Sequence, residues 1–279
     1  MRQLVLVVGA AGQLGTAMVE RLEAEHEVVG RTRDELDVTR PEDVRAAVAS
    51  VCPDVVINCS AYTNVDGAET DPVTALDVNA WAVRTLAMAA GDVDATFVHF
   101  STDFVFDGET DRPYVETDAP NPRSVYAQSK LLGEWLAAET PRHYVLRVES
   151  LFGGSRGRSS IDRMLDAIRA GREVRAFSDR AVSPSHVDDV VTATEALLEA
   201  GAPFGLYHCV NSGWTTWEGV ARELAAVAGR PEAVITPVRM ADASLLAPRP
   251  LFAALSNDRL RDLGIALPSW QDALRRLAH

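Results

Sequence analysis

The sequence of 279 residues predicts an α/β fold, with a doubly wound parallel sheet and a smaller, mixed α/β C-terminal lobe. The chain opens with an apolar run, 4–8, that leads directly into a glycine-rich turn at 9–15. Short apolar segments then alternate with amphipathic ones as far as about residue 150, which is typical of a parallel sheet covered on both faces. Beyond that point the alternation loosens, and proline and glycine become more frequent.

In chain order, the first half predicts strands near 4–8, 26–29, 54–58, 95–100 and 143–148 and helices near 13–24, 41–51, 72–91 and 124–139. The second half predicts helices near 159–170, 187–199, 216–228 and 270–277, with a strand at 206–210. Pro41 suits the first turn of its helix, and Thr39 is expected to cap that helix. Thr216 is expected to cap another, while Trp214 and Trp217 are expected in the core.

The glycine-rich turn is the first functional signal. Gly9 and Gly12 carry no side chain where a dinucleotide pyrophosphate would approach the backbone, and Gly15 lets the next helix pack closely on the sheet. The N-terminus of that helix then faces the phosphates. We therefore expect a dinucleotide-binding Rossmann domain over residues 1–150. Residues 151–279 should form mainly a substrate-binding lobe, with some segments returning to the Rossmann sheet.

Tyr126 and Lys130 give the second signal. Lys130 is the only lysine among 27 lysine and arginine residues. On a helix, residues four apart share one face, and an ammonium beside a phenol favours the phenolate. The spacing therefore predicts that Lys130 lowers the pKa of Tyr126 from about 10 and that Tyr126 is a general acid. The alternative is an ordinary surface pair.

The composition excludes several partners. A net charge of -13, with acidic residues spread along the chain, argues against nucleic acid as a partner. No charged leader precedes an apolar stretch and no apolar run approaches the roughly 20 residues of a membrane span, so we expect a cytoplasmic protein with no membrane partner. Many acids with one lysine favour a halophilic source, where salt screens self-repulsion. A GC-rich genome that replaces lysine with arginine is the alternative.

Cysteine and histidine give no metal pattern. Cys52, Cys59 and Cys209 form no C-x-x-C pair, so we expect reduced packing residues. The six histidines are too scattered for ligand spacing, so no structural metal is expected.

Together the motifs resemble those of extended short-chain dehydrogenases/reductases and, within them, of dTDP-4-dehydrorhamnose reductases, over nearly the whole chain. The matching segments are 9–15, 36–39, 56–66, 78–79, 101–108, 113–116, 126–130 and 249–250. The resemblance implies an NAD(P)H-dependent reductase of a nucleotide-linked 4-keto sugar, foremost dTDP-4-dehydrorhamnose reduced to dTDP-L-rhamnose. Tyr126 would donate a proton to the carbonyl oxygen, Lys130 would bind the nicotinamide ribose, and Thr102 would orient the carbonyl.

The resemblance also implies further contacts. The expected cofactor-binding residues are Gly9, Gly12, Gln13, Leu14, Gly15, Arg31, Arg33, Asp37, Val38, Cys59, Ser60, Ala61, Tyr62, Tyr126 and Lys130. The expected substrate-binding residues are Thr102, Asp103, Phe104 and Arg249. Asp103 could instead only cap a turn. Arg249 suits a diphosphate, with a salt bridge to a carboxylate as the alternative.

The end of the second strand bears on cofactor choice. Where NAD-preferring folds place an acid, this chain has Arg31 and Arg33, which suit the 2′-phosphate of NADP. Asp34 and Glu35 follow closely and keep NAD open. We therefore expect NADPH as the preferred cofactor.

One departure leaves the sugar open. Reductases of this type often read Arg-Thr-Ser-Trp-Val-Tyr-Gly where this chain has residues 147–153, so Ser150 stands in place of the tryptophan.

Two other functions also stay open. A nucleotide-sugar epimerase or dehydratase would need further catalytic acids, for which there is no signature, and the presence of Thr102, Tyr126 and Lys130 speaks against a non-catalytic NADP-binding regulatory subunit. A homodimer is left open.

Overall fold

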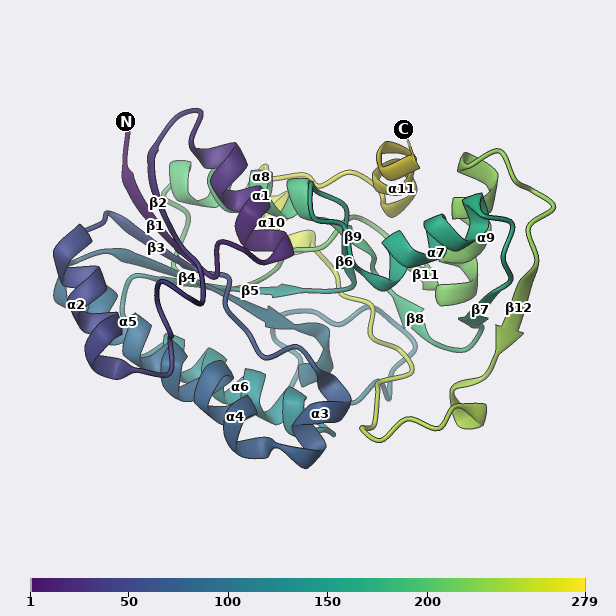
Figure 1. Ribbon diagram of the computed structural model, residues 1–279, viewed down its shortest axis with the longest axis horizontal. Coiled ribbons are helices and arrows are strands. Elements are labelled where there is room, and N and C mark those ends of the chain that lie inside the picture. Colours follow the sequence, from purple (N-terminus) through teal and green to yellow (C-terminus); the bar gives the residue numbers. More distant parts are fainter. Residues whose placement is uncertain (1, 279) are drawn as a thin grey trace.

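The computed structural model describes residues 2–278 and confirms the predicted α/β class (Figure 1). Its centre is a six-stranded parallel sheet with the strand order β10-β5-β4-β3-β1-β2. The strands are β1 (Leu4–Val8), β2 (Glu27–Arg31), β3 (Val55–Asn58), β4 (Thr96–Thr102), β5 (His143–Val148) and β10 (Gly205–His208). From β1 the chain adds β2 on one side of the sheet and then β3, β4, β5 and β10 on the other side, so the strand order reverses between β1 and β3. Ligands of open α/β sheets bind at such a switch point.

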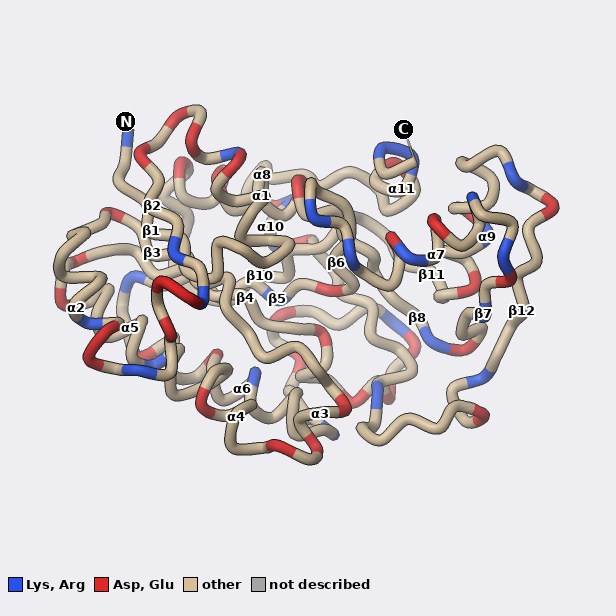
Figure 2. The backbone as a smooth tube through the Cα atoms, viewed as in Figure 1, with Lys and Arg blue, Asp and Glu red and all other residues tan. Residues whose placement is uncertain are grey.

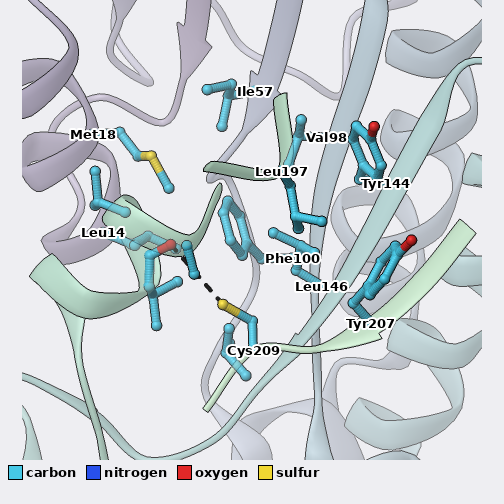
Figure 3. Packing of buried hydrophobic residues seen from close by; sticks show 14 of the residues in the cluster. Leu14, Met18, Ile57, Val98, Phe100, Tyr144, Leu146, Leu197, Tyr207 and Cys209 are labelled. Atoms are coloured by element: carbon cyan, nitrogen blue, oxygen red, sulfur yellow. Dashed lines mark hydrogen bonds between the residues drawn. The ribbon is translucent and has the colours of Figure 1, made fainter. Parts of the chain in front are cut away.

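Helices cover both faces of this sheet (Figure 1). One face carries α1 (Gln13–Leu22), α8 (Val187–Glu199) and α10 (Asp258–Asp262). The other carries α2 (Pro41–Val51), α5 (Ala82–Asp92) and α6 (Val125–Ala137). Because side chains alternate along a strand, Val5 and Val7 of β1 belong to the first core and Leu6 and Val8 to the second. Figure 3 shows the first core, in which β-strand side chains meet Leu14 and neighbours from the helices.

The second half of the chain contributes to both parts of the molecule. Its strand β10 pairs in parallel with β5 at the edge of the large sheet, and α8 packs on α1. The remaining helices, α7 (Ser160–Arg169), α9 (Trp217–Val227) and α11 (Trp270–Ala278), surround a separate core that includes Ile161, Leu224 and Leu274. This smaller lobe lies beyond the carboxyl ends of the sheet strands (Figure 1).

Short strand pairs complete the smaller lobe and confirm its mixed character. β7 (Val174–Phe177) pairs in parallel with β12 (Ile235–Val238), and β6 (Leu151–Phe152) with β9 (Ser185–His186). β8 (Ala181–Val182) and β11 (Thr215–Thr216) are antiparallel. A 3-10 turn, η3 (Met240–Asp242), follows β12.

Predicted and observed elements differ in a few places. The expected helix at 72–91 is divided into α4 (Pro72–Leu76), a π-helical segment η1 (Asp77–Trp81) and α5. The sequence analysis also missed α3 (Val65–Thr70) and the 3-10 turn η2 (Asp103–Val105). Its cap for α2 is wrong, because the hydroxyl of Thr39 donates to Asp37 Oδ1 at 2.7 Å and Arg40 occupies the N-cap position. The cap by Thr216 on Gly219 N is confirmed.

Two packing predictions are wrong for one residue each. Cys209 is buried in the first core and Cys59 packs against that core (Figure 3 labels Cys209). Cys52 is exposed at the C-terminal end of α2, where its φ is 49°. Trp217 is buried, but Trp214 is 45% exposed and stands edge-on to Phe252. Within residues 2–278, no helix combines the length and apolarity needed to cross a membrane.

Candidate functional site

The glycine turn after β1 has the close packing that the sequence predicts. Gly9 has a φ of 80°, and a Cβ on it would lie 2.7 Å from the backbone nitrogen of Ser60. A Cβ on Gly15 would lie 2.2 Å from the carbonyl oxygen of Gly9. Only glycine is therefore accommodated at both positions without movement of the backbone. No side chain caps α1 at Gly12, so the first N–H groups of that helix are free to face a ligand.

A first cavity, of about 490 Å³, lies over this turn and the ends of β2 and β3. The predicted cofactor residues that line it are Gly9, Gly12, Arg33, Asp37, Val38, Cys59, Ser60, Ala61 and Tyr62. Arg31 does not line it; its carbonyl oxygen accepts hydrogen bonds from Gly9 and Ala10. Glu35 does not line it either, because its carboxylate accepts from the backbone and hydroxyl of Thr32. Arg33 is thus the basic side chain facing this cavity.

Two further cavities extend the first one along the sheet edge. The second, of about 460 Å³, shares Gly12 and 59–61 with the first and adds Gln13, Leu14 and Lys130. The third, of about 430 Å³, adds residues of the smaller lobe. Thr102, Asp103 and Tyr126 line both the second and the third cavity. The three cavities form one cleft, with the predicted catalytic side chains at its middle.

Local structure places Tyr126 at this point. Ser124 caps α6 by accepting from Ala127 N at 3.2 Å, so Tyr126 lies in the first turn of the helix, next to the cleft. Gly133 has no side chain, which lets α6 pack tightly on the π-helical segment. A Cβ at this position would lie 2.1 Å from the carbonyl oxygen of Asn79. The ring of Tyr126 stands edge-on to Phe104 at 5.7 Å.

Thr102 ends β4 beside this phenol. Its hydroxyl donates to Asp103 Oδ1 at 2.9 Å and accepts from Phe104 N at 3.3 Å. Burial raises the pKa of the Asp103 carboxyl to about 6, although Arg180 acts in the opposite direction. The second carboxylate oxygen of Asp103 has no hydrogen-bond partner.

The predicted effect of Lys130 on Tyr126 is wrong in this structure. Lys130 Nζ donates to the carbonyl oxygen of Phe100 at 2.5 Å and lies 3.4 Å from His99 Nε2. Burial raises the pKa of Tyr126 well above its usual value, opposed only by the Thr102 hydroxyl. Burial also lowers the pKa of Lys130 to about 8. The phenol therefore stays protonated at neutral pH, as a proton donor requires.

The sequence analysis missed two asparagines that support the cleft. Asn58 Oδ1 accepts from Ser60 N and Oγ, which directs its amide nitrogen to His99 Nδ1 at 3.2 Å. Asn79, in the π-helical segment, accepts from Tyr62 N and donates to Tyr62 O. Both fix the segment after β3 that lines the first cavity. The position of Asn58 at the end of a strand could have identified it as a site residue from the sequence. The role of Asn79 could not be predicted in this way, because it depends on a tertiary contact with Tyr62.

The third cavity contains further residues that the sequence analysis missed. Arg163 of α7, Arg180 before β8 and Trp217 of α9 line it from the smaller lobe. Ser150 lines it too, with a left-handed φ of 46°. Only Ser150 could be noticed from the sequence, because it stands where related reductases often have tryptophan. The other three residues come from separate segments of the chain, so no local sequence pattern indicates that they meet.

Arg249 lies outside the three cavities. Its two terminal nitrogens each donate to one carboxylate oxygen of Asp66 at 2.9 Å, and one also donates to the carbonyl oxygen of Ala247. Arg249 thereby lowers the pKa of Asp66 to about 2. The guanidinium of Arg249 thus forms a salt bridge with a carboxylate, which was the alternative to a diphosphate contact. A contact between Arg249 and the substrate diphosphate stays a prediction.

One group of carboxylates in the described chain has the spacing of metal ligands. Ligand atoms of Glu25, Glu195 and Glu199 lie within 4.8 Å of one another. None of these residues lines the cleft.

The parallel sheet, the glycine turn and the cleft with Thr102, Tyr126 and Lys130 define an oxidoreductase of the extended short-chain dehydrogenase/reductase class. The model of the RmlD substrate binding domain family matches residues 1–279. The chain belongs to this family, that of the dTDP-4-dehydrorhamnose reductases.

Three relatives illustrate the similarity. A dTDP-4-dehydrorhamnose reductase of Burkholderia thailandensis is 37% identical over 97% of this chain and 96% of its own length. A probable dTDP-4,6-dihydroxy-2-methyloxan-3-one 4-ketoreductase of Streptomyces antibioticus is 38% identical, over 97% and 92%. The crystal structure of the Bacillus anthracis dTDP-4-dehydrorhamnose reductase in complex with NADP superimposes with a TM-score of 0.94 at 30% identity, covering 99% of each chain.

Proposed function

We propose that the protein reduces dTDP-4-dehydrorhamnose to dTDP-L-rhamnose with NADPH, a step of dTDP-rhamnose biosynthesis. The observation that carries this proposal is the single cleft in which Thr102 and Tyr126 lie between the glycine turn and the smaller lobe. The names of the relatives, which include two dTDP-sugar reductases, support the substrate class.

We assign the first and second cavities to NADPH. The glycine turn fits a pyrophosphate, because Gly9 and Gly12 leave the backbone bare and the α1 N-terminus is uncapped. Arg33 would bind the 2′-phosphate, since a guanidinium matches phosphate oxygens and no acid of 34–35 lines the cavity. NADP in the Bacillus anthracis relative supports this choice over NAD.

NADPH supplies the hydride when it is bound. Tyr126 donates its phenolic proton to the carbonyl oxygen, which becomes the new hydroxyl. Thr102 would turn its hydroxyl proton from Asp103 Oδ1 to that oxygen, while it continues to accept from Phe104 N. Lys130 binds the ribose next to the reacting ring. Asp103 and Phe104 line the substrate side of the same cleft.

An assay of NADPH oxidation in the presence of the keto sugar tests this function. Purified protein with NADPH is offered dTDP-4-dehydrorhamnose, made by the upstream dehydratase and epimerase, and NADPH absorbance is followed. Turnover, and a higher kcat/KM with NADPH than with NADH, are expected. Activity on a different 4-keto nucleotide sugar alone would keep the chemistry and reject rhamnose. NADPH binding without reduction of any such sugar would favour a regulatory subunit.

The charge of the protein bears on its cellular location and its partners. We propose a cytoplasmic enzyme from a halophilic cell, because 40 acidic residues against 27 basic ones are spread along the whole chain (Figure 2). The same distribution speaks against a nucleic-acid partner. A homodimer stays open.

A further inference from the structure

The third cavity collects polar atoms that lack a partner. Within residues 2–278, five buried side-chain nitrogen or oxygen atoms have no hydrogen-bond partner. Three of them, Asp103 Oδ2, Arg180 Nε and Trp217 Nε1, belong to residues that line this cavity. Buried polar groups are nearly always hydrogen-bonded, and leaving one unpaired is costly. Their concentration beside Tyr126 indicates that a ligand supplies the missing partners.

The two donors are held in place by aromatic and backbone contacts. The guanidinium carbon of Arg180 lies 5.1 Å from the ring centre of Phe104 and 6.0 Å from that of Trp217. The carbonyl oxygen of Arg180 accepts from Trp217 N at 3.2 Å, which ties the start of α9 to the segment before β8. Phe104 in turn contacts Tyr126. The donors therefore have a fixed position relative to the proton donor.

Glu149 lies behind this group, and its Oε1 is a fourth unpartnered atom. Its other oxygen accepts from Ser183 N at 2.6 Å, and burial together with Asp103 raises the pKa of Glu149 well above its usual value, although Arg180 acts in the opposite direction. Reductases of this type often have serine at this position and tryptophan at the next, where this chain has Ser150. Relative to that pattern, this chain has a small alcohol in place of a large indole and a buried carboxyl group that holds the backbone at Ser183.

The arrangement suits one kind of ligand group. Arg180 and Trp217 offer N–H donors, and Asp103 offers an acceptor. A hydroxyl can accept from the first two and donate to the third, whereas a methylene can do neither. An anionic substituent is disfavoured beside Asp103, whose carboxyl group already attracts Arg180. Neighbouring hydroxyls of a neutral sugar ring match this set.

We propose that Arg180 and Trp217, with Asp103 beside them and Glu149 as a positioning residue, bind the ring hydroxyls of the keto sugar and make the protein selective for substrates that keep hydroxyls at both C2 and C3. This inference rests on the proposed function. A site that hydrogen-bonds a substrate hydroxyl rejects an analogue without it strongly, because its own buried groups are left unpaired.

The test compares kcat/KM for dTDP-4-dehydrorhamnose and for its 2-deoxy counterpart. The unaltered protein is expected to prefer the first by at least about a hundredfold. Trp217→Phe keeps one aromatic ring but removes the indole N–H together with the second fused ring, and it should lower this preference by about tenfold. Trp214→Phe is the matched control, because Trp214 is exposed on the same lobe and lies outside the cleft. It should leave the preference unchanged.

Arg180→Lys extends the test, since lysine keeps the charge and lacks Nε. It should also reduce the preference, while an unchanged Kd for NADPH shows that the fold is intact. Equal efficiency on both sugars in the unaltered protein, or an equal preference in Trp217→Phe and Trp214→Phe, would overturn this inference and leave the proposed function standing. If neither sugar is reduced, the proposed function is overturned and the inference with it.

Discussion

Lys130 Nζ lies 3.4 Å from His99 Nε2, and the two side chains are buried together beneath the cleft. Asn58 directs its amide nitrogen to His99 Nδ1, so a neutral His99 carries its proton on Nε2, facing Lys130. Burial and the nearby ammonium lower the pKa of His99 well below its usual value and keep the ring neutral. The Nε2–H group cannot accept from the ammonium, which instead donates to the Phe100 carbonyl oxygen.

This enclosure explains the single lysine and predicts the effect of replacing it. Lys130 is 2% exposed, so the larger planar guanidinium of Lys130→Arg would displace His99 or the β4 backbone. We expect the arginine variant to lose most of its kcat although the charge is kept. Lys130→Met should weaken both NADPH binding and turnover. Steady-state kinetics and fluorescence titration with NADPH measure the two effects, and a fully active arginine variant would contradict this interpretation.

The same lysine predicts a pH dependence of cofactor binding. Burial lowers the pKa of Lys130 to about 8, so the ammonium form is present below pH 8 and is lost as the pH rises through that value. The ammonium is the form that attracts the anionic cofactor and can donate all three of its hydrogens. We therefore expect the Kd for NADPH to rise above pH 8 in the unaltered protein. Lys130→Met serves as the control, because its Kd should not show this step.

Tyr126→Phe should abolish turnover while NADPH still binds. Only the phenolic proton is removed, and a general acid contributes about 10²–10⁴-fold to the rate. Tyr114→Phe is a suitable control, since the hydroxyl of Tyr114 donates to Asp107 and Tyr114 does not line the cleft. Kcat and the Kd for NADPH are measured for both variants. Comparable activity in Tyr126→Phe and the unaltered protein would remove Tyr126 from the mechanism.

The sequence predicted the parts of this site that depend on local structure. Gly9 and Gly15 follow a buried strand directly, and Tyr126 and Lys130 share one helix. The neighbouring residues in the sequence were therefore sufficient to predict where these four residues lie. Arg180 and Trp217 meet only because β8 pairs with β11, and nothing within either segment indicates that pairing. The direction of Lys130 likewise depends on Phe100 and His99, which belong to another element. Long-range contacts of this kind are not encoded in spacing or hydrophobic periodicity.

A buried ion pair next to the cleft predicts a large loss of stability. Arg147 of β5 donates two hydrogen bonds to Glu134 of α6, at 2.8 and 2.7 Å, with both side chains almost fully buried. Glu134→Ala would leave the guanidinium without its partner, and breaking such a pair costs about 3–5 kcal/mol. The pair Arg84–Glu139 is about half exposed, so Glu139→Ala should cost at most about 1 kcal/mol. Urea unfolding at one salt concentration gives both values, and equal losses would refute the difference.

The acidic surface predicts that folding and activity depend on salt. With 40 acidic against 27 basic residues, the folded chain repels itself at low ionic strength, and salt on the order of molar reduces the screening length to about 3 Å. We expect the circular dichroism signal and kcat to increase together during a KCl titration. NaCl at equal concentration is the control, because general screening acts alike for both salts. A protein that is equally folded and active in dilute buffer would show that the charge does not limit stability, and the arginine-rich composition would then reflect a GC-rich genome.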